Sequence, residues 1–179
     1  MIGETVTARI LLALLCLLAL AHLSGSLSAQ PRVISGFGAA TGPEGYPRRE
    51  GAHQGVDLAA AVATSVIAPA DGVVDRTIQD DLCGNGIVVS HGALATVYCH
   101  LSEVAVHAGQ SVRRAEVLGR TGTTGLRPGP GFEHLHFEVR NGPTPDATRL
   151  DPMTFIIGCF EPGLQYPTDR LVLTYPLSC

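Results

Sequence analysis

The stretch EHLHFEV, residues 133–139, decides how the rest of the chain is interpreted. Its apolar residues alternate with polar ones, which is typical of a β-strand whose successive side chains point to opposite faces of a sheet. Three apolar side chains are therefore predicted to face a core together, namely Leu135, Phe137 and Val139. His134 and His136 are predicted to share the opposite face. Two imidazoles on one face of a strand indicate a site with a chemical task.

The composition is that of one folded, turn-rich domain. The chain has 179 residues, of which 45% are hydrophobic, with 21 Gly and 12 Pro. This length suffices for a single domain with a real core and is short for two. The net charge is −4 and the basic residues form no patch, which excludes nucleic acid as an expected partner. We expect a monomer.

The first 29 residues are predicted to be a signal peptide rather than part of the fold. Residues 10–23 are a short apolar run, and small residues follow it around a cleavage point after Ala29. The run is shorter than the roughly 20 apolar residues of a spanning helix, so we expect export to the periplasm or the medium without stable membrane insertion after cleavage. An uncleaved anchor is the alternative, because Arg9 and the terminal amine are opposed by Glu4.

Export leaves an even set of four cysteines in an oxidising compartment. Sequence proximity favours the pairs Cys83–Cys99 and Cys159–Cys179 among the three possible pairings. A zinc site of four thiolates is the competing interpretation, but the chain has no C-x-x-C pair to support it. The second pair would tie down a C-terminal tail, residues 159–179, which we expect to pack on the outside of the domain.

Short apolar segments separated by Gly, Pro, Asp and Asn predict an all-β fold, mainly an antiparallel sheet or barrel-like sandwich. Residues 65–79 predict two strands with a turn at 70–72, and residues 86–104 predict a hairpin that turns near Gly92. Residues 111–122 predict another short strand, and the strand that begins at Leu135 should end at the Asn-Gly turn, 141–142. No segment has a long helical period.

The remaining polar pattern supplies partners for the two histidines. His53 and Asp57 stand in the order H-x-x-x-D, which places both on the same side of a helix or of an extended strand. In the predicted hairpin, His100 should point away from Cys99 and Leu101, and therefore away from the core together with a partly buried Tyr98.

These residues suffice for a catalytic zinc site, which needs three protein ligands and an open position for water. His53, Asp57 and one of the pair His134 and His136 would be the ligands. The other histidine of the pair and His100 would be left beside the metal, where hydrolysis requires a base and a hydrogen-bond donor.

The chain resembles the lysostaphin- and LytM-type zinc endopeptidases, the M23 family that cuts peptidoglycan peptides. The resemblance covers about residues 35–155 and follows the family order: SGFG, HQGVDLAA, IAPADGVV, GNGIVVSHG, YCHLS, GQSVRRAEVLGRTGTTG, HLHFEV and DPMTF. The ordered set of H-x-x-x-D, Y-x-H-L-S and H-L-H-F-E is specific, whereas a single H-x-H is weak.

The resemblance implies roles for five residues and an outline of the domain. His53, Asp57 and His136 would bind one zinc ion per chain, and His100 and His134 would be the catalytic histidines. It also implies an M23-like endopeptidase domain over residues 30–158 with a mostly antiparallel sheet, and peptidoglycan peptides as substrate. Two alternatives are a catalytically inactive module that activates another cell-wall hydrolase and a secreted protease for Gly-rich proteins.

The segment LRPGPGFE, residues 126–133, is longer than is usual in the family and is predicted to border the substrate groove, with Arg127 or Glu133 meeting charged groups of a stem peptide. His91 and His107 match no motif position and are left outside the site. Glu138 is interpreted as a solvent-facing strand residue.

Overall fold

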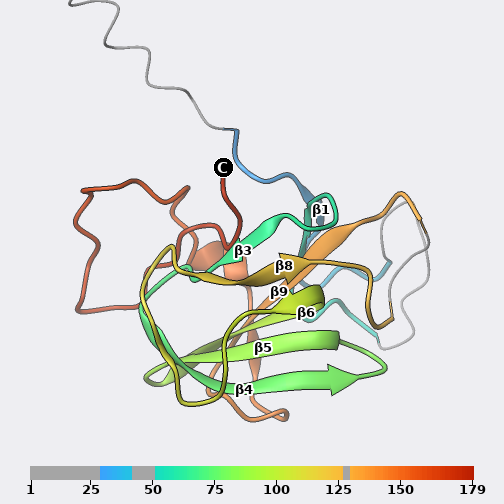
Figure 1. The fold of residues 1–179 in the computed structure, drawn as a ribbon, viewed down its shortest axis with the longest axis horizontal. Helices are drawn as coiled ribbons and strands as arrows, with labels where there is room; N and C mark the ends of the chain where they lie inside the picture. The colour runs from blue at the N-terminus through green and yellow to red at the C-terminus, as the bar shows by residue number, and fades with distance from the viewer. Residues whose placement is uncertain (1–28, 42–50, 127–129) are drawn as a thin grey trace, which may run out of the picture.

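The computed structural model describes residues 29–41, 51–126 and 130–179, and nearly all of their regular structure is antiparallel β-sheet (Figure 1). No α-helix lies within these residues, which confirms the predicted fold class. The strands are β1 (Val33–Ser35), β2 (Val56–Ala59), β3 (Ser65–Ile67), β4 (Gly72–Asp80), β5 (Gly84–His91), β6 (Leu94–Val104), β7 (Ser111–Val112), β8 (Val117–Thr121), β9 (His134–Arg140) and β10 (Arg149–Leu150), followed by the 3-10 turn η2 (Pro152–Thr154).

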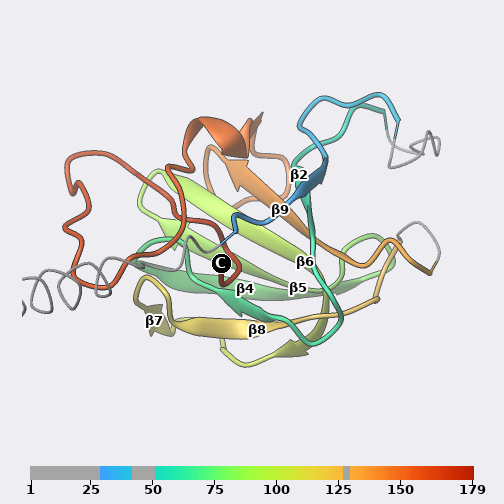
Figure 2. The same ribbon diagram turned by 90° about the horizontal axis from the view of Figure 1, so that it is seen from above.

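One ten-stranded sheet has the order β1-β2-β9-β6-β5-β4-β7, and β8 and β10 pair with β6 and β9 off this path. Strand β3 pairs with β8. Seen from above, β2 and β9 lie on one side of the fold and β7 and β8 on the other (Figure 2). The predicted hairpin of residues 86–104 is confirmed, since β5 turns into β6 and pairs with it. The two strands predicted at residues 65–79 are present as β3 and β4, but they form no hairpin, because β3 pairs with β8 and β4 pairs with β5 and β7.

The segment predicted as a single strand at residues 111–122 is two strands, β7 and β8. A turn separates them, in which the amide of Glu116 donates to the carbonyl of Arg113 and the Glu116 carboxylate accepts from the amide of Arg113. Ala115 within this turn has a φ of 68°. Since this left-handed conformation cannot continue a strand, the turn separates the two pairings.

The predicted core face of β9 is confirmed, because Leu135, Phe137 and Val139 are each fully buried. Tyr98 is also fully buried, with its ring centroid 5.4 Å from that of Phe137, so our expectation of a partly buried wall residue was wrong. Its hydroxyl is satisfied inside the core by Thr96 Oγ1 at 2.8 Å, which explains how a phenol is tolerated there.

The C-terminal tail contributes to this same core, contrary to the expectation that it packs on the outside. Residues 172–177 are buried, and Leu173, Tyr175 and Leu177 join the main apolar cluster. Leu177 also forms an isolated bridge to Val66 in β3. Both predicted disulfides are present, Cys83–Cys99 and Cys159–Cys179, so the tail is held by a covalent bond as well as by burial.

Strand β6 changes its partner at His100. Along one edge, the first half of β6 pairs with β9, and this pairing ends at Cys99, which lies opposite His136. The second half pairs with β8, beginning at Leu101, which lies opposite Thr121. His100 itself has a φ of 67°, so it interrupts the alternation of side chains.

This bulge corrects the predicted orientation of residues 99–101. Cys99 belongs to a small cluster on one face with Val88 and Val97, whereas Leu101 belongs to the main core with Tyr98. The two neighbours of His100 therefore lie on different faces, not on one. His100 itself stands at the point of β6 where the pairing with β9 ends and the pairing with β8 begins.

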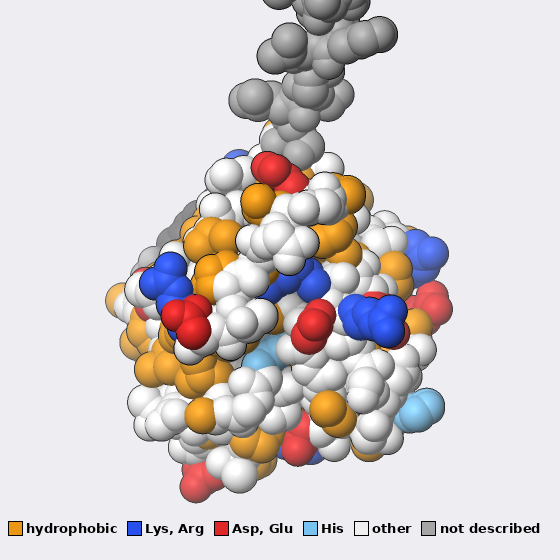
Figure 3. All heavy atoms as spheres, turned by 90° about the vertical axis from the view of Figure 1, so that its left-hand side faces the viewer, with side chains coloured by type: hydrophobic (Ala, Val, Ile, Leu, Met, Phe, Trp, Pro, Cys, Tyr) orange, Lys and Arg blue, Asp and Glu red, His pale blue; other side chains and the backbone are white. Residues whose placement is uncertain are grey.

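No helix among the described residues is long and apolar enough to cross a membrane. Figure 3 shows one face of the molecule, on which basic and acidic side chains are interspersed with apolar ones.

Candidate active site

Three side chains converge where β2 pairs with β9. Asp57 is the direct cross-strand partner of His136, which places both on the same face of the sheet. His53 precedes β2 and lies four residues before Asp57. The three contacting atoms are close to equidistant: His53 Nε2 is 3.0 Å from Asp57 Oδ1 and 3.0 Å from His136 Nδ1, and His136 Nδ1 is 2.9 Å from Asp57 Oδ1.

A glycine permits this approach. A Cβ atom on Gly55 would lie 2.3 Å from the carbonyl oxygen of Phe137, so the chain between His53 and Asp57 can lie against β9 only without a side chain at this position. This contact accounts for the G in the HQGVD stretch, and it brings the two strand-borne ligands and His53 to one point.

The remaining nitrogen of each imidazole indicates the tautomer. His53 Nδ1 donates to the carbonyl of Gly36 at 2.8 Å, because a carbonyl oxygen can only accept. His136 Nε2 lies 3.1 Å from the carboxylate of Glu138 and donates to it. The inward nitrogens, His53 Nε2 and His136 Nδ1, are therefore lone-pair acceptors in the neutral rings, and they face the acceptor Asp57.

Three acceptors at one point require a cation or a proton among them. Burial by itself would lower the pKa of His136, but hydrogen bonds to Asp57 and Glu138 outweigh it and raise the pKa to about 9. Burial would likewise raise the pKa of Asp57, but hydrogen bonds to His136 and His53 outweigh it and hold the pKa well below its usual range. The protein thus stabilises positive charge here, as a metal site must.

The geometry fits zinc. The three residues form a candidate metal-binding group whose ligand atoms all lie within 4.8 Å of one another. Ligands about 2.0–2.1 Å from a tetrahedral zinc ion lie about 3.3 Å apart, close to the spacing of these atoms. Two imidazoles and one carboxylate are a composition that zinc enzymes use, and it leaves a fourth position open.

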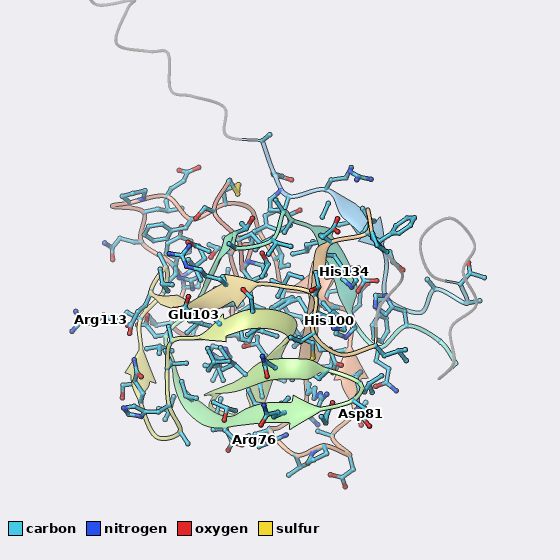
Figure 4. The ribbon with its side chains drawn as sticks, turned by 45° about the vertical axis from the view of Figure 1, so that its right-hand side comes forward. Arg76, Asp81, His100, Glu103, Arg113 and His134 are labelled. Carbon is cyan, nitrogen blue, oxygen red and sulfur yellow. A yellow bond between two sulfur atoms is a disulfide. The ribbon has the colours of Figure 1, made fainter. Side chains whose placement is uncertain are left out.

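His100 and His134 lie side by side next to this group, with ring centroids 4.9 Å apart (Figure 4). His100 Nδ1 donates to the carbonyl of Thr124 at 2.8 Å, and His134 Nδ1 donates to that of Phe132 at 2.6 Å. Both rings therefore have unprotonated Nε2 atoms available. His134 Nε2 is 3.7 Å from Asp57 Oδ1, which directs it toward the candidate metal group.

The surroundings of both imidazoles disfavour their protonated forms. Burial, followed by the nearby His134 and His136, lowers the pKa of His100 to about 4. Burial is also the main reason why the pKa of His134 lies below its ordinary value, although Asp57 opposes the shift. A neutral imidazole with a directed Nε2 lone pair can accept a proton, so this pair can serve as a general base.

The two carbonyls that hold these histidines lie at the two ends of the segment 126–133. Thr124 precedes the segment, and Phe132 lies near its end, two residues before His134. Arg127 lies outside the described residues. The carboxylate of Glu133 accepts from the amide of Gly131 at 3.2 Å, and its backbone carbonyl accepts from Ala60. The predicted role of this segment in substrate recognition stays a prediction.

Glu138 is the residue that sequence reasoning placed wrongly. It is only 5% exposed, not solvent-facing, and it lies on the face of β9 that carries His134 and His136. Its Oε2 accepts from Arg140 Nε at 2.6 Å. Burial would raise the pKa of Glu138, but hydrogen bonds from His136 and Arg140 outweigh it and lower the pKa to about 2. The available signal was the alternation H-x-H-x-E-x-R itself, which puts all four polar residues on one face.

The two histidines left outside the site lie elsewhere. His91 donates through Nδ1 to the carbonyl of Asp71 at 2.7 Å, and its Nε2 lies 2.9 Å from Thr96 Oγ1. His107 is exposed and contacts the carbonyl of Ala108. Neither contributes a side chain to the candidate metal group.

Comparison with known proteins gives a consistent result. The model of peptidase family M23 matches residues 51–152. The chain is 40% identical over 93 residues to the peptidoglycan DD-endopeptidase ShyA of Vibrio cholerae, an alignment that covers 51% of this chain and 21% of ShyA. The chain thus spans about a fifth of the length of that curated relative.

Solved structures show the same fold. A zinc-containing peptidase from Vibrio cholerae matches with a TM-score of 0.57 and 31% identity, over 70% of this chain and 37% of that one. The catalytic domain of the antimicrobial peptidase lysostaphin from Staphylococcus simulans matches with a TM-score of 0.60 and 29% identity, over 70% of this chain and 91% of that domain.

Proposed function

The chain belongs to peptidase family M23, and on that premise we propose that it is a zinc-dependent endopeptidase that hydrolyses peptide bonds in peptidoglycan cross-links or stem peptides. The observation that carries the proposal is the convergence of three acceptor atoms, from His53, Asp57 and His136, beside two neutral imidazoles. ShyA, a relative named as a peptidoglycan DD-endopeptidase, supports the substrate class.

We assign one zinc ion per chain to His53 Nε2, Asp57 Oδ1 and His136 Nδ1. When bound, this ion supplies a water of lowered pKa and polarises the carbonyl of the scissile bond. The hydrogen bonds from His53 to Gly36 and from His136 to Glu138 hold the outward nitrogens as donors, so that the inward nitrogens are the ones available to bind the ion.

His100 and His134 perform the proton chemistry. In hydrolysis, the water oxygen bonds to the carbonyl carbon, the carbon–nitrogen bond breaks, and a proton moves from the water to the departing amine. A neutral Nε2 accepts that proton, and the resulting imidazolium donates it to the amine. The second imidazole accepts a hydrogen bond from the attacking water through its own Nε2 lone pair and so positions that water. The carbonyls of Thr124 and Phe132 hold both rings in the tautomer that this sequence of events requires.

We place the activity outside the cytoplasm, as expected for a peptidoglycan hydrolase. The two disulfides support this location, since such bonds persist in oxidising compartments. The proposed signal peptide, residues 1–29, lies almost wholly outside the described residues.

The test is digestion of purified peptidoglycan by the purified protein loaded with zinc, with the fragments identified by mass spectrometry. We expect fragments with new amino and carboxyl ends at peptide bonds, no such fragments from protein treated with a chelator, and far slower release of them by His134→Ala. Binding to peptidoglycan without cleavage, by protein that retains zinc, would overturn the proposal in favour of the inactive module. Cleavage of Gly-rich proteins alone would support the secreted protease instead.

A further inference from the structure

We propose that Glu138 is a positioning residue that fixes which nitrogen of His136 faces the metal. The inference rests on the proposed zinc site and extends it to a residue that has no place among the ligands or the catalytic histidines.

His53 and His136 present different nitrogens. His53 points Nε2 inward, and its Nδ1 donates to a backbone carbonyl, that of Gly36. His136 points Nδ1 inward, because its position opposite Asp57 on β9 brings the nearer nitrogen to that carboxylate. Its Nε2 therefore points along β9, away from the other ligands and toward Glu138.

Glu138 meets this nitrogen because it lies two residues farther along the same strand. Residues i and i+2 share a face, so the carboxylate is beside the imidazole without any bend of the chain. Its Oε1 is 3.1 Å from His136 Nε2. Because the carboxylate can only accept at this point, Nε2 must carry the proton. The lone pair of the neutral ring is then on Nδ1, the nitrogen that faces the metal site.

The second oxygen of Glu138 is held as firmly as the first. Oε2 accepts from Arg140 Nε at 2.6 Å, and Arg149 Nε lies 3.7 Å from it. Glu138 and Arg140 are 5% and 7% exposed. A buried carboxylate is costly unless it is paired and hydrogen-bonded, and here each oxygen has its own donor. Arg140 therefore fixes the carboxylate, and the carboxylate fixes the imidazole.

This arrangement makes a sharp prediction for Glu138→Gln. An amide has one acceptor and one donor end, whereas this position needs two acceptors. Arg140 is always protonated and can only donate, so it binds the amide oxygen. The NH2 group of the amide is then left facing His136 Nε2. That contact favours the tautomer with the proton on Nδ1, which is the wrong one for metal binding. We expect zinc affinity to fall by about 10–100-fold, the usual effect of losing such a partner.

Adding Arg140→Gln to the same chain provides a rescue. A glutamine at position 140 can accept from the amide NH2 at position 138, so the oxygen of that amide is free to turn to His136 Nε2. We expect the double variant Glu138→Gln/Arg140→Gln to bind zinc more tightly than Glu138→Gln alone. Glu103→Gln is the matched control, because Glu103 is an exposed glutamate that also pairs with an arginine, Arg120, at 3.4 Å. It should bind zinc like the wild type.

The measurement is the zinc dissociation constant by competition with a chelating dye, together with urea unfolding of each metal-free variant to verify folding. Wild-type affinity in Glu138→Gln, or no recovery in the double variant, would overturn the proposal. A wild-type protein that binds no zinc would instead overturn the proposed function, so the two failures are distinguishable.

A further readout needs no variant. Nitrogen NMR of labelled imidazoles in the zinc-loaded wild type should show His136 ligated through Nδ1 with a proton on Nε2, and His53 ligated through Nε2 with a proton on Nδ1. Ligation of His136 through Nε2 would overturn the proposal.

Discussion

Gly84 and Gly125 lie back to back at the start of β5, so close that a Cβ atom on Gly125 would be 2.4 Å from the amide nitrogen of Gly84. The same is true in reverse, since a Cβ atom on Gly84 would be 2.4 Å from the carbonyl carbon of Thr124. The contact fixes the position of Thr124, whose carbonyl holds His100. Two glycines far from each other in sequence therefore set the orientation of the His100 imidazole.

Gly125→Ala should accordingly damage both stability and turnover. Gly92→Ala is the matched control, because Gly92 has a similarly positive φ, 80° against 74°, but open space around it. The control should lose about 1–2 kcal/mol, the cost of a left-handed alanine, with unchanged turnover. Gly125→Ala should lose more and also cleave more slowly, as measured by urea unfolding and steady-state kinetics. Equal losses in the two variants would show that the close contact is unimportant.

His53→Ala and Asp57→Asn should lose most of the bound zinc. Each change removes one of three ligands, and in the asparagine variant a neutral amide replaces the anion. Metal analysis of the purified variants provides the measurement, with about one zinc per chain expected in the wild type. His107→Ala, a change at an exposed histidine outside the site, is the control. Full zinc occupancy in both ligand variants would contradict the assignment.

His100→Ala and His134→Ala should behave differently, because these residues are assigned to proton transfer and not to metal retention. Both variants should keep zinc while turnover falls by roughly 10²-fold or more, the scale of lost acid–base catalysis. Zinc content and turnover need to be measured on the same samples. Loss of the metal from either variant would place that histidine among the ligands.

The two disulfides should contribute similar stability but affect activity differently. Each double variant removes one bridge: Cys83→Ala/Cys99→Ala removes a bridge with a sequence separation of 16, and Cys159→Ala/Cys179→Ala removes one with a separation of 20. Each variant should lose about 2–4 kcal/mol of unfolding free energy, as measured with urea. The first pair adjoins His100, whose amide donates to the carbonyl of Cys83 at 2.8 Å. Turnover should therefore fall in the first variant and stay unchanged in the second. The opposite pattern would argue against the placement of His100.

Stability should decline as the pH falls below the ordinary pKa of histidine, in part because of His91. Burial first, and then Arg114, lowers the pKa of His91 from 6.5 in the folded protein, while the hydrogen bond to Asp71 opposes this. The unfolded chain then binds a proton more readily than the folded one, so this contribution is complete above pH 6.5 and is lost as the pH decreases. In metal-free protein between about pH 7.5 and 5, His91→Gln should show a flatter pH dependence of unfolding than the wild type. Parallel curves would rule out a contribution from His91.

The features that could be predicted from sequence depend on interactions between residues that are close together along the chain. The strand period of residues 134–139 and the proximity of the cysteines are local, and they predicted the core face of β9 and both disulfides. Motif order predicted which five residues come together, although their roles stay predictions.

The errors concern features that depend on neighbours distant in sequence. His100 leaves the alternation because β6 exchanges one partner strand for another, and no local pattern announces that exchange. Glu138 is buried because Arg140 and Arg149 neutralise it, so a carboxylate that looks exposed in sequence lies inside. The tail is buried because Leu177 reaches β3, far earlier in the chain.

The connection between β8 and β9 is attached at both ends to the imidazoles that it adjoins, through Thr124 and Phe132. The two ends of this connection, which hold the imidazoles, can therefore be kept while the residues between them are changed by protein engineering. We predict that a replacement for residues 126–131 that preserves Gly125 and Phe132 changes which peptides are cleaved while both imidazoles keep their hydrogen bonds to Thr124 and Phe132. On the proposed function, we predict that libraries confined to these positions retain hydrolysis and vary the choice of substrate.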